Sequence, residues 1–207
     1  MRTWVKICGL STPETVAAAV EAGADAVGFV FAAGSPRTID PVTARELAAR
    51  VPADVETVGV FRGQSIATVL ELARASSVST VQLHGDETPA DVAAVHEAGF
   101  RVIRAVSAAA YAAEPEEARV AFREDALLLD AVAPGAGATF DAGSLLAAPP
   151  GRDWLLAGGL APDNVSGLLA GWRPHGAVGV DVSSGVESSR GVKSVELIRA
   201  FVAAARA

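Results

Sequence analysis

The sequence predicts a single (β/α)₈ barrel over residues 1–207. Short runs of β-branched or apolar residues alternate eight times with longer runs rich in alanine, glutamate and leucine. Eight strand–helix units in one chain favour a closed barrel of parallel strands. At 207 residues, 51 % of them hydrophobic and 20 % charged, the chain is long enough for one well-buried domain. We expect no linker or second domain.

The expected strands are apolar runs of four to six residues. In chain order they are Trp4–Cys8, Ala26–Phe31, Thr57–Phe61, Thr80–His84, Arg101–Val106, Ala126–Asp130, Trp154–Ala157 and Ala177–Asp181. An open doubly wound sheet is the alternative architecture. It usually has fewer units and a glycine fingerprint after the first strand, which this sequence lacks.

The expected helices lie between these strands. They are Pro13–Ala22, Pro41–Val51, Ser65–Ala75, Pro89–Ala98, Ala109–Phe122, Gly143–Ala147, Asn164–Ala170 and Ser194–Ala205. Several of them begin with known start signals, such as the proline in the first turn after Thr12 and after Thr88. Gly23 and Gly99 follow helices where a left-handed C-terminal cap is expected.

Charge and cysteine content restrict the partners. The net charge of −7 argues against nonspecific binding to nucleic acid or to anionic membranes. The segment after Met1 has no sustained apolar run of a signal peptide, and no apolar stretch is long enough to span a bilayer. With one cysteine, the sequence predicts a cytoplasmic protein that needs neither a disulfide nor a membrane anchor.

Cys8, the one cysteine, ends the first expected strand. Strand alternation places it on one face with Trp4 and Lys6, and a lysine beside a thiol is an unusual lining for a core. The alternative is that Cys8 is a small buried hydrophobic residue, as free cysteines usually are.

Other polar residues also lie at strand ends, where barrel active sites gather. They are Arg37 after the second strand, His84 on the fourth, Asp130 on the sixth, and Asp181 with Ser183 and Ser184 at the eighth. If Cys8, His84 and Asp130 face inward, Lys6, Gln82 and Leu128 do too, and Arg104 and Asp181 are candidates to join them. Because strands one and eight adjoin in a closed barrel, we expect Lys6 to lie near Asp181, as a structural ion pair or as part of the site.

Two glycine-rich turns predict a phosphate site. Gly158-Gly159 follow the seventh strand, and Ser183-Ser-Gly185 follow the eighth at a possible short extra helix. Barrels commonly bind phosphate with these two loops and a helix N-terminus. The alternative is that the glycines only permit tight turns.

The chain resembles the phosphoribosylanthranilate isomerase family, from tryptophan biosynthesis, over essentially its whole length. The matching segments are Val5–Gly9, Ala22–Phe31, Ser35–Arg37, Val58–Phe61, Val81–Glu87, Leu128–Asp130, Ala157–Leu160 and Gly179–Glu187. Their combination in this order is specific, whereas any one alone is not.

The resemblance implies an Amadori rearrangement of N-(5-phosphoribosyl)anthranilate. Cys8 then looks like the general base, Asp130 like the general acid and Arg37 like the carboxylate-binding residue. The turns with Gly158, Gly159, Ser183, Ser184 and Gly185 would hold the phosphate, with Asp181 and His84 in the site wall. His84 has packing as its alternative role. The resemblance implies no metal or organic cofactor, a phosphorylated small-molecule substrate, and a monomer.

Some segments depart from the family pattern. Ala32-Ala-Gly34 stands where members often carry bulkier or basic residues. In the loop after the sixth strand, Pro134 and Ala136 replace what are often glycine and a hydroxyl residue, and Ala142 stands where members often have tryptophan. These changes concern substrate loops and leave the acid and the base in place. Alternatives to the assigned reaction are the related histidine-pathway isomerase, an enzyme serving both pathways, or a catalytically inactive sugar-phosphate binder.

Overall fold

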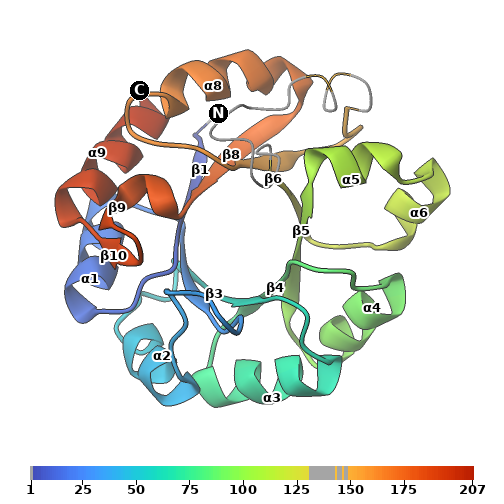
Figure 1. The fold of residues 1–207 in the computed structure, drawn as a ribbon, viewed down its shortest axis with the longest axis horizontal. Helices are drawn as coiled ribbons and strands as arrows, with labels where there is room; N and C mark the ends of the chain where they lie inside the picture. Colours follow the sequence, from blue (N-terminus) through green and yellow to red (C-terminus); the bar gives the residue numbers. More distant parts are fainter. Residues whose placement is uncertain (1, 131–142, 144–145, 147–148) are drawn as a thin grey trace.

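In a computed structural model of the chain, eight parallel strands close into a barrel surrounded by helices (Figure 1). The structure describes residues 2–130, 143, 146 and 149–207. The strands follow one another around the barrel in chain order, and β1 (Trp4–Cys8) pairs with β8 (Ala177–Val182) to close it. The closed barrel is therefore confirmed, and the doubly wound sheet is excluded.

All eight expected strands are present, with ends that shift by at most one residue. The others are β2 Ala26–Val30, β3 Glu56–Phe61, β4 Thr80–Leu83, β5 Arg101–Ser107, β6 Ala126–Asp130 and β7 Trp154–Ala157. The longest, β5, begins with Arg101 and ends with Ser107, so it has a polar residue at each end.

The described helices lie on the outside of the barrel. They are α1 Pro13–Ala22, α2 Pro41–Ala48, α3 Ile66–Ser76, α4 Pro89–Glu97, α5 Ala108–Ala113, α6 Glu116–Ala121, α8 Val165–Trp172 and α9 Val195–Arg206. The expected start signals are used: the hydroxyls of Thr12 and Thr88 accept hydrogen bonds from backbone N–H groups of α1 and α4. Gly23 ends α1 with a φ of 88° in the left-handed region.

The single helix expected over Ala109–Phe122 is wrong in one respect, because the structure has two short helices there. Pro115 has no N–H group to donate, and it confines the preceding Glu114 to an extended conformation with ψ of 139°. The expected helix Gly143–Ala147 and the 133–142 loop lie largely outside the described residues.

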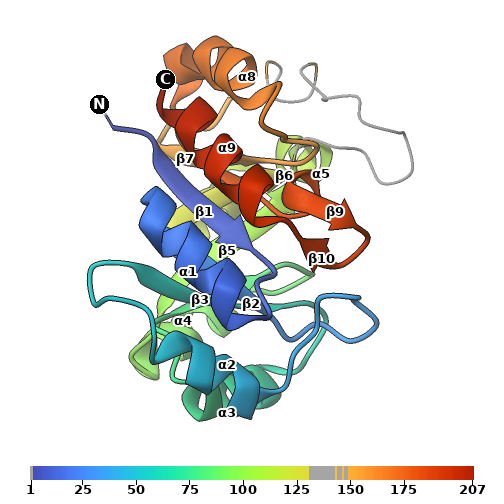
Figure 2. The same ribbon diagram turned by 90° about the vertical axis from the view of Figure 1, so that its left-hand side faces the viewer.

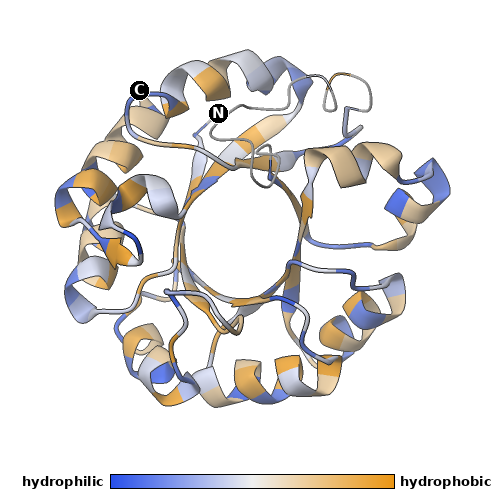
Figure 3. Cartoon of the chain, in the orientation of Figure 1, coloured by the Kyte–Doolittle hydropathy of each residue, from blue (hydrophilic) through white to orange (hydrophobic). Residues whose placement is uncertain are grey.

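Two apolar layers hold the barrel. The larger packs the outer face of the strands against the helices, and the smaller fills the lumen. Hydrophobic residues accordingly run along much of the barrel wall in Figure 3. The lumen residues are mostly small or branched: Cys8, Ala26, Val30, Val58, Val60, Ile103, Ala105, Leu128, Leu155 and Ala157. Small lumen side chains leave room for a cavity at one end.

Arg104 does not join the lumen, which corrects that expectation. It pairs in register with Leu83 and Leu127, which both belong to the outer apolar layer. Its guanidinium forms an ion pair with Glu114 and lies 3.5 Å from the centroid of the Phe122 ring. Arg104 therefore stabilises the packing of α5 and α6 on the barrel.

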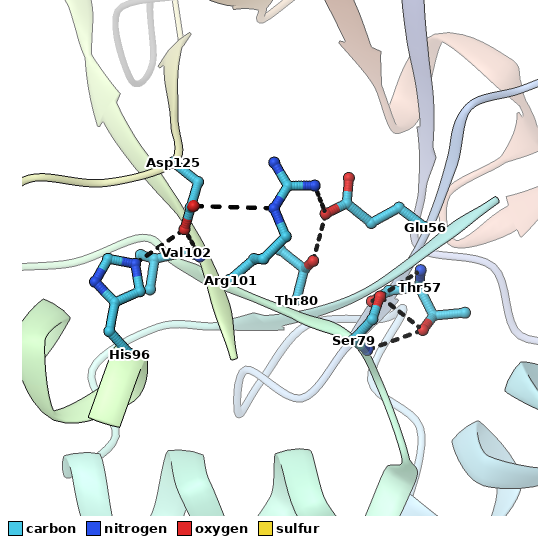
Figure 4. A network of polar contacts seen from close by, with 8 residues as sticks. All are labelled: Glu56, Thr57, Ser79, Thr80, His96, Arg101, Val102 and Asp125. Carbon is cyan, nitrogen blue, oxygen red and sulfur yellow. Dashed lines mark hydrogen bonds and ion pairs between the residues drawn. The ribbon is translucent and has the colours of Figure 1, made fainter. Parts of the chain in front are cut away.

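A polar network lies at the end of the barrel where the strands begin (Figure 4). Arg101 donates to Glu56 at 2.9 Å and lies 3.9 Å from Asp125, so one guanidinium bridges the starts of β3 and β6. Asp125 also accepts hydrogen bonds from His96 and from the Val102 N–H. The charged residues at this end therefore pair with one another and connect neighbouring strands and α4.

At the opposite end of the barrel, a turn and a short hairpin follow the last strand. Beyond β8 come a 3₁₀ turn, Ser184–Val186, and a hairpin of β9 (Glu187–Ser189) and β10 (Val192–Lys193). Figure 2 shows this hairpin at the end toward which the strand arrows point. The short extra helix expected after strand eight is thus present as the 3₁₀ turn. In the part of the chain that the structure describes, no helix is long and apolar enough to cross a membrane.

Candidate active site

A cavity of about 560 Å³ opens at the ends of the strands. Every predicted site residue except Gly185 lines it: Cys8, Arg37, His84, Gly158, Gly159, Asp130, Asp181, Ser183 and Ser184. Cys8 ends β1 and Asp130 ends β6, on well-separated parts of the barrel rim. Thiol and carboxyl therefore face a common space, as an acid–base pair acting on one substrate requires.

Cys8 lines the cavity but is only 6 % exposed. Burial raises the pKa of the Cys8 thiol, and the neighbouring positive charge of Lys6 only partly opposes this effect. At neutral pH the thiol is therefore protonated in the unliganded protein. For Cys8 to act as a base, as predicted from the sequence, its thiolate has to be generated by transfer of this proton.

The expected contact between Lys6 and Asp181 is confirmed. Lys6 is completely buried and its Nζ donates to Asp181 Oδ1 at 2.7 Å. Burial alone would lower the pKa of Lys6, but the Asp181 charge raises it above its ordinary value, so the ammonium stays charged. Asp181 also lines the cavity, which makes the pair both a structural ion pair and part of the floor of the site.

His84 lies on the cavity wall, and burial lowers the pKa of its imidazole despite the opposing charge of Asp130. It is therefore neutral at neutral pH, with one ring nitrogen able to donate and the other able to accept a hydrogen bond.

The turn after β7 is held open toward the cavity. Gly158 and Gly159 both have positive φ, 91° and 64°, a conformation that residues with a Cβ rarely adopt. The Asn164 side chain fixes the turn, because its Nδ2 donates to the Gly159 carbonyl and its Oδ1 accepts from the Ala161 N–H. Both glycines are needed for the backbone conformation of the turn, and both also line the cavity.

Gly185 lies behind the cavity wall, against the backbone of the loop that follows β7. A Cβ atom at this position would overlap the carbonyl oxygen of Leu160. The loops after β7 and β8 can therefore approach each other only because residue 185 has no side chain.

Replacing Gly185 with alanine is expected to force the two glycine turns apart. Overpacking of this kind costs about 1–3 kcal/mol in the free energy of unfolding, and KM should rise at least about tenfold if the turns bind phosphate. Gly167→Ala in α8 is the matched control, since a Cβ there meets nothing within 4 Å and alanine favours the helix. Urea unfolding and steady-state kinetics of both variants test this, and equal behaviour of the two would contradict it.

A charged network lies beside the cavity and was not expected from the sequence. Arg37 donates from Nε and Nη2 to the two carboxylate oxygens of Glu187, at 2.6 and 3.0 Å. Lys193, whose side chain is 1 % exposed, donates to Glu187 Oε1 at 2.9 Å and to the Ser183 carbonyl at 2.7 Å. The hairpin therefore links Arg37 to the serine turn, and the cluster keeps one net positive charge.

Glu187 stays ionised well into the acid range. Burial alone would raise its pKa, but hydrogen bonds from Arg37, the Gly191 N–H and Lys193 outweigh burial and lower the pKa to about 2.

This pKa predicts acid sensitivity of the folded protein. Glu187 binds protons more weakly in the folded chain than in the unfolded one, so its stabilising contribution is complete above pH 4.5 and is lost as the pH falls toward 2. Glu187→Gln should make the free energy of unfolding lower at pH 7 and less dependent on pH in this range. Urea titrations at pH 7, 5, 4 and 3 test this, and parallel curves for wild type and variant would contradict it.

Several residues in or beside the cavity were not predicted from the sequence. Ser35 and Arg62 line the cavity from the loops after β2 and β3. Lys193 and Glu187 lie in a hairpin whose two strands have five residues in all, and no spacing in the sequence signals that Lys193 reaches back to Ser183.

Among the described residues, no group of three or more His, Cys, Asp or Glu side chains is placed to hold a metal ion.

Known proteins match the chain over nearly its full length. The family model of N-(5'-phosphoribosyl)anthranilate (PRA) isomerase matches residues 5–204. An N-(5'-phosphoribosyl)anthranilate isomerase of Afipia carboxidovorans is 46 % identical, covering 98 % of this chain and 89 % of the relative. The one from Paracoccus denitrificans is 43 % identical, covering 100 % and 99 %.

Solved structures agree with these matches. Phosphoribosyl anthranilate isomerase from Thermus thermophilus has a TM-score of 0.82 and 41 % identity, with 98 % of each chain covered. Another phosphoribosyl anthranilate isomerase, in complex with reduced 1-(o-carboxyphenylamino)-1-deoxyribulose 5-phosphate, has a TM-score of 0.80 and 36 % identity, again with 98 % of each chain covered. The chain belongs to the N-(5'-phosphoribosyl)anthranilate isomerase family.

Proposed function

We propose that the protein catalyses the Amadori rearrangement of N-(5-phosphoribosyl)anthranilate to 1-(2-carboxyphenylamino)-1-deoxyribulose 5-phosphate in tryptophan biosynthesis. The observation that carries this proposal is the shared cavity of Cys8 and Asp130, beside two glycine-containing turns, in a chain of this family. A relative has been solved with a reduced analogue of the proposed product.

Asp130 is the proposed general acid. A proton from its carboxylic acid passes to the furanose ring oxygen, the bond between that oxygen and C1 breaks, and the anthranilate nitrogen forms a double bond to C1. Asp130 lies half-buried at the end of β6, between Ser107 and Ala157 on the adjoining strands. Such a position gives a carboxyl group contact with the substrate and limited contact with water.

Cys8 is the proposed general base. The C1–N double bond acidifies the proton on C2, the Cys8 thiolate removes this proton, and the electron pair moves through C1 to nitrogen. The resulting enolamine takes a proton at C1 and loses one from the C2 hydroxyl, which gives the ketone. Each step moves a proton or an electron pair that Cys8, Asp130 and the substrate nitrogen can accept or supply, so we propose that the residues act without a metal or an organic cofactor.

The raised pKa of the Cys8 thiol restricts how the reactive state forms. A thiolate at Cys8 with a carboxylic acid at Asp130 carries the same total charge as a thiol with a carboxylate. Moving one proton across the cavity therefore produces the reactive pair without exchange with bulk water. Lys6 next to Cys8 stabilises the thiolate once it forms.

Arg37 is proposed to bind the anthranilate carboxylate. Its Nε and one N–H of Nη2 are engaged by Glu187, which fixes the plane of the guanidinium. The remaining N–H groups are available to a planar carboxylate. The phosphate is assigned to the turns with Gly158, Gly159, Ser183 and Ser184, whereas Gly185 supports them from behind. His84 and Asp181 complete the wall.

The histidine-pathway alternative is not favoured. Its chemistry is usually run with a carboxylate where this chain has Cys8, and its substrate has two phosphates. A second phosphate would need its own binding site, on the side of the cavity away from the glycine turns. Arg62 lines that side, but a single arginine does not form such a site.

We also propose a monomer in the cytoplasm. Among the large hydrophobic side chains exposed in the described residues, Val42, Val120 and Val192 lie on three different elements, α2, α6 and β10. Dimers occur in this family, as in Thermotoga maritima. Light scattering at several concentrations distinguishes the two states.

Fluorescence-monitored conversion of freshly prepared N-(5-phosphoribosyl)anthranilate by the purified protein tests the function. We expect saturable turnover, with little or none on the bisphosphorylated aminoaldose of the histidine pathway. Comparable turnover of both substrates would indicate a dual enzyme, and binding without turnover would indicate a catalytically inactive sugar-phosphate binder.

A further inference from the structure

Gln82 is a polar side chain in an otherwise apolar part of the barrel lumen. It lies on β4, in register with Val60 on β3 and Ile103 on β5, and it is 3 % exposed. Both neighbours belong to the lumen layer, and Gln82 lines the cavity together with Val60. A methionine or leucine would fill this position without introducing a polar group.

The amide of Gln82 is incompletely satisfied. Its Oε1 is buried and accepts no hydrogen bond from any described residue. Buried amides in native proteins are normally paired, because an unpaired one loses its hydration without compensation. Gln64 illustrates the usual case: its Oε1 accepts from the Arg62 N–H at 2.7 Å and its Nε2 donates to the Phe31 carbonyl at 2.8 Å.

The position of Gln82 relative to the residues assigned to phosphate and carboxylate indicates which group of the substrate it could contact. In a closed barrel of eight strands β4 lies opposite β8, so Gln82 is across the lumen from Asp181 and from the serine turn assigned to phosphate. Arg37, with its positive charge, suits the substrate carboxylate. A neutral amide both donates and accepts, which matches a hydroxyl group rather than an anion.

We propose that Gln82 is a further substrate-binding residue, whose amide hydrogen-bonds a hydroxyl of the ribosyl moiety. The inference rests on the proposed function for the identity of the sugar. Oε1 has no partner among the described residues, and rotation of the amide toward the cavity that Gln82 lines would let the bound sugar supply one. A site of this kind also selects against analogues that lack the hydroxyl, because the buried amide would then remain unpaired.

Two variants test the proposal, Gln82→Met and the matched Gln64→Met. Methionine at position 82 removes an unsatisfied polar group from an apolar surrounding, so Tm should stay within about 1 °C of wild type or rise. KM and the Kd for the product should both increase about tenfold or more, with kcat changing less than about threefold. Gln64→Met should lower Tm, because it breaks two hydrogen bonds to the backbone.

Each outcome decides the question. Unchanged KM and product affinity in Gln82→Met would overturn the proposal, and so would a lowered Tm or a failure to fold, since either indicates a structural role. Wild-type protein without turnover would instead refute the proposed function, whereas a failure confined to Gln82→Met leaves that function intact.

Discussion

Replacing Cys8 with serine is expected to lower kcat by about 10² to 10⁴, the usual contribution of a general base. A serine hydroxyl has nearly the same size as the thiol but ionises far less readily, so proton removal from C2 loses its acceptor. Asp130→Asn should cause a similar loss, because an amide delivers no proton to the ring oxygen. Single-turnover fluorescence measurements of both variants, with saturating substrate, isolate the chemical step.

Two controls accompany these variants. Affinity for the product should change less than about threefold, since the substrate's phosphate and carboxylate are assigned to the glycine turns and to Arg37, and not to Cys8 or Asp130. The double variant should lose little more activity than either single one, because acid and base serve one reaction sequence. Retention of a tenth or more of kcat by Cys8→Ser would refute its assignment as the base.

Replacing Lys6 with methionine is expected to cause the largest loss of stability. The substitution keeps the volume of the side chain but leaves Asp181, whose side chain is 10 % exposed, without its partner. Breaking a buried ion pair in this way costs about 3–5 kcal/mol, which corresponds to a fall in Tm of roughly 10 °C for a domain of this length. Thermal and urea unfolding at pH 7 measure the effect.

The double variant Lys6→Met, Asp181→Leu is the informative control. Replacing both members of a buried pair with apolar residues is often neutral or stabilising, so the double variant should regain most of the lost stability while remaining inactive. A loss below about 1 kcal/mol in Lys6→Met alone would show that water or another charge compensates Asp181.

Much of the barrel follows from local signals in the sequence. Strand periodicity, proline at the first turn and capping hydroxyls act over a few residues, so the strands and most helix starts were predicted within a residue. The break between α5 and α6 carries a local signal too, since Pro115 restricts Glu114, but the surrounding alanine-rich run hides it.

The candidate site was partly predictable for a topological reason. The carboxyl ends of all strands of a closed barrel meet at one rim, so residues at strand ends share a cavity however far apart they lie in the chain. Cys8, His84, Asp130 and Asp181 were placed in this way, and the Lys6–Asp181 contact followed from the adjacency of β1 and β8.

Other features depend on the direction and depth of side chains, which only the tertiary structure decides. Alternation divides β5 into two faces, but both faces of a parallel barrel strand are buried, so nothing local shows that Arg104 points outward. The sequence by itself determined the barrel and its rim, and it predicted the residues of the proposed acid–base pair. Folding decided the link from Arg37 through Glu187 to Lys193, and it decided that burial keeps the Cys8 thiol protonated, because ion pairing and desolvation depend on residues brought together from distant parts of the chain.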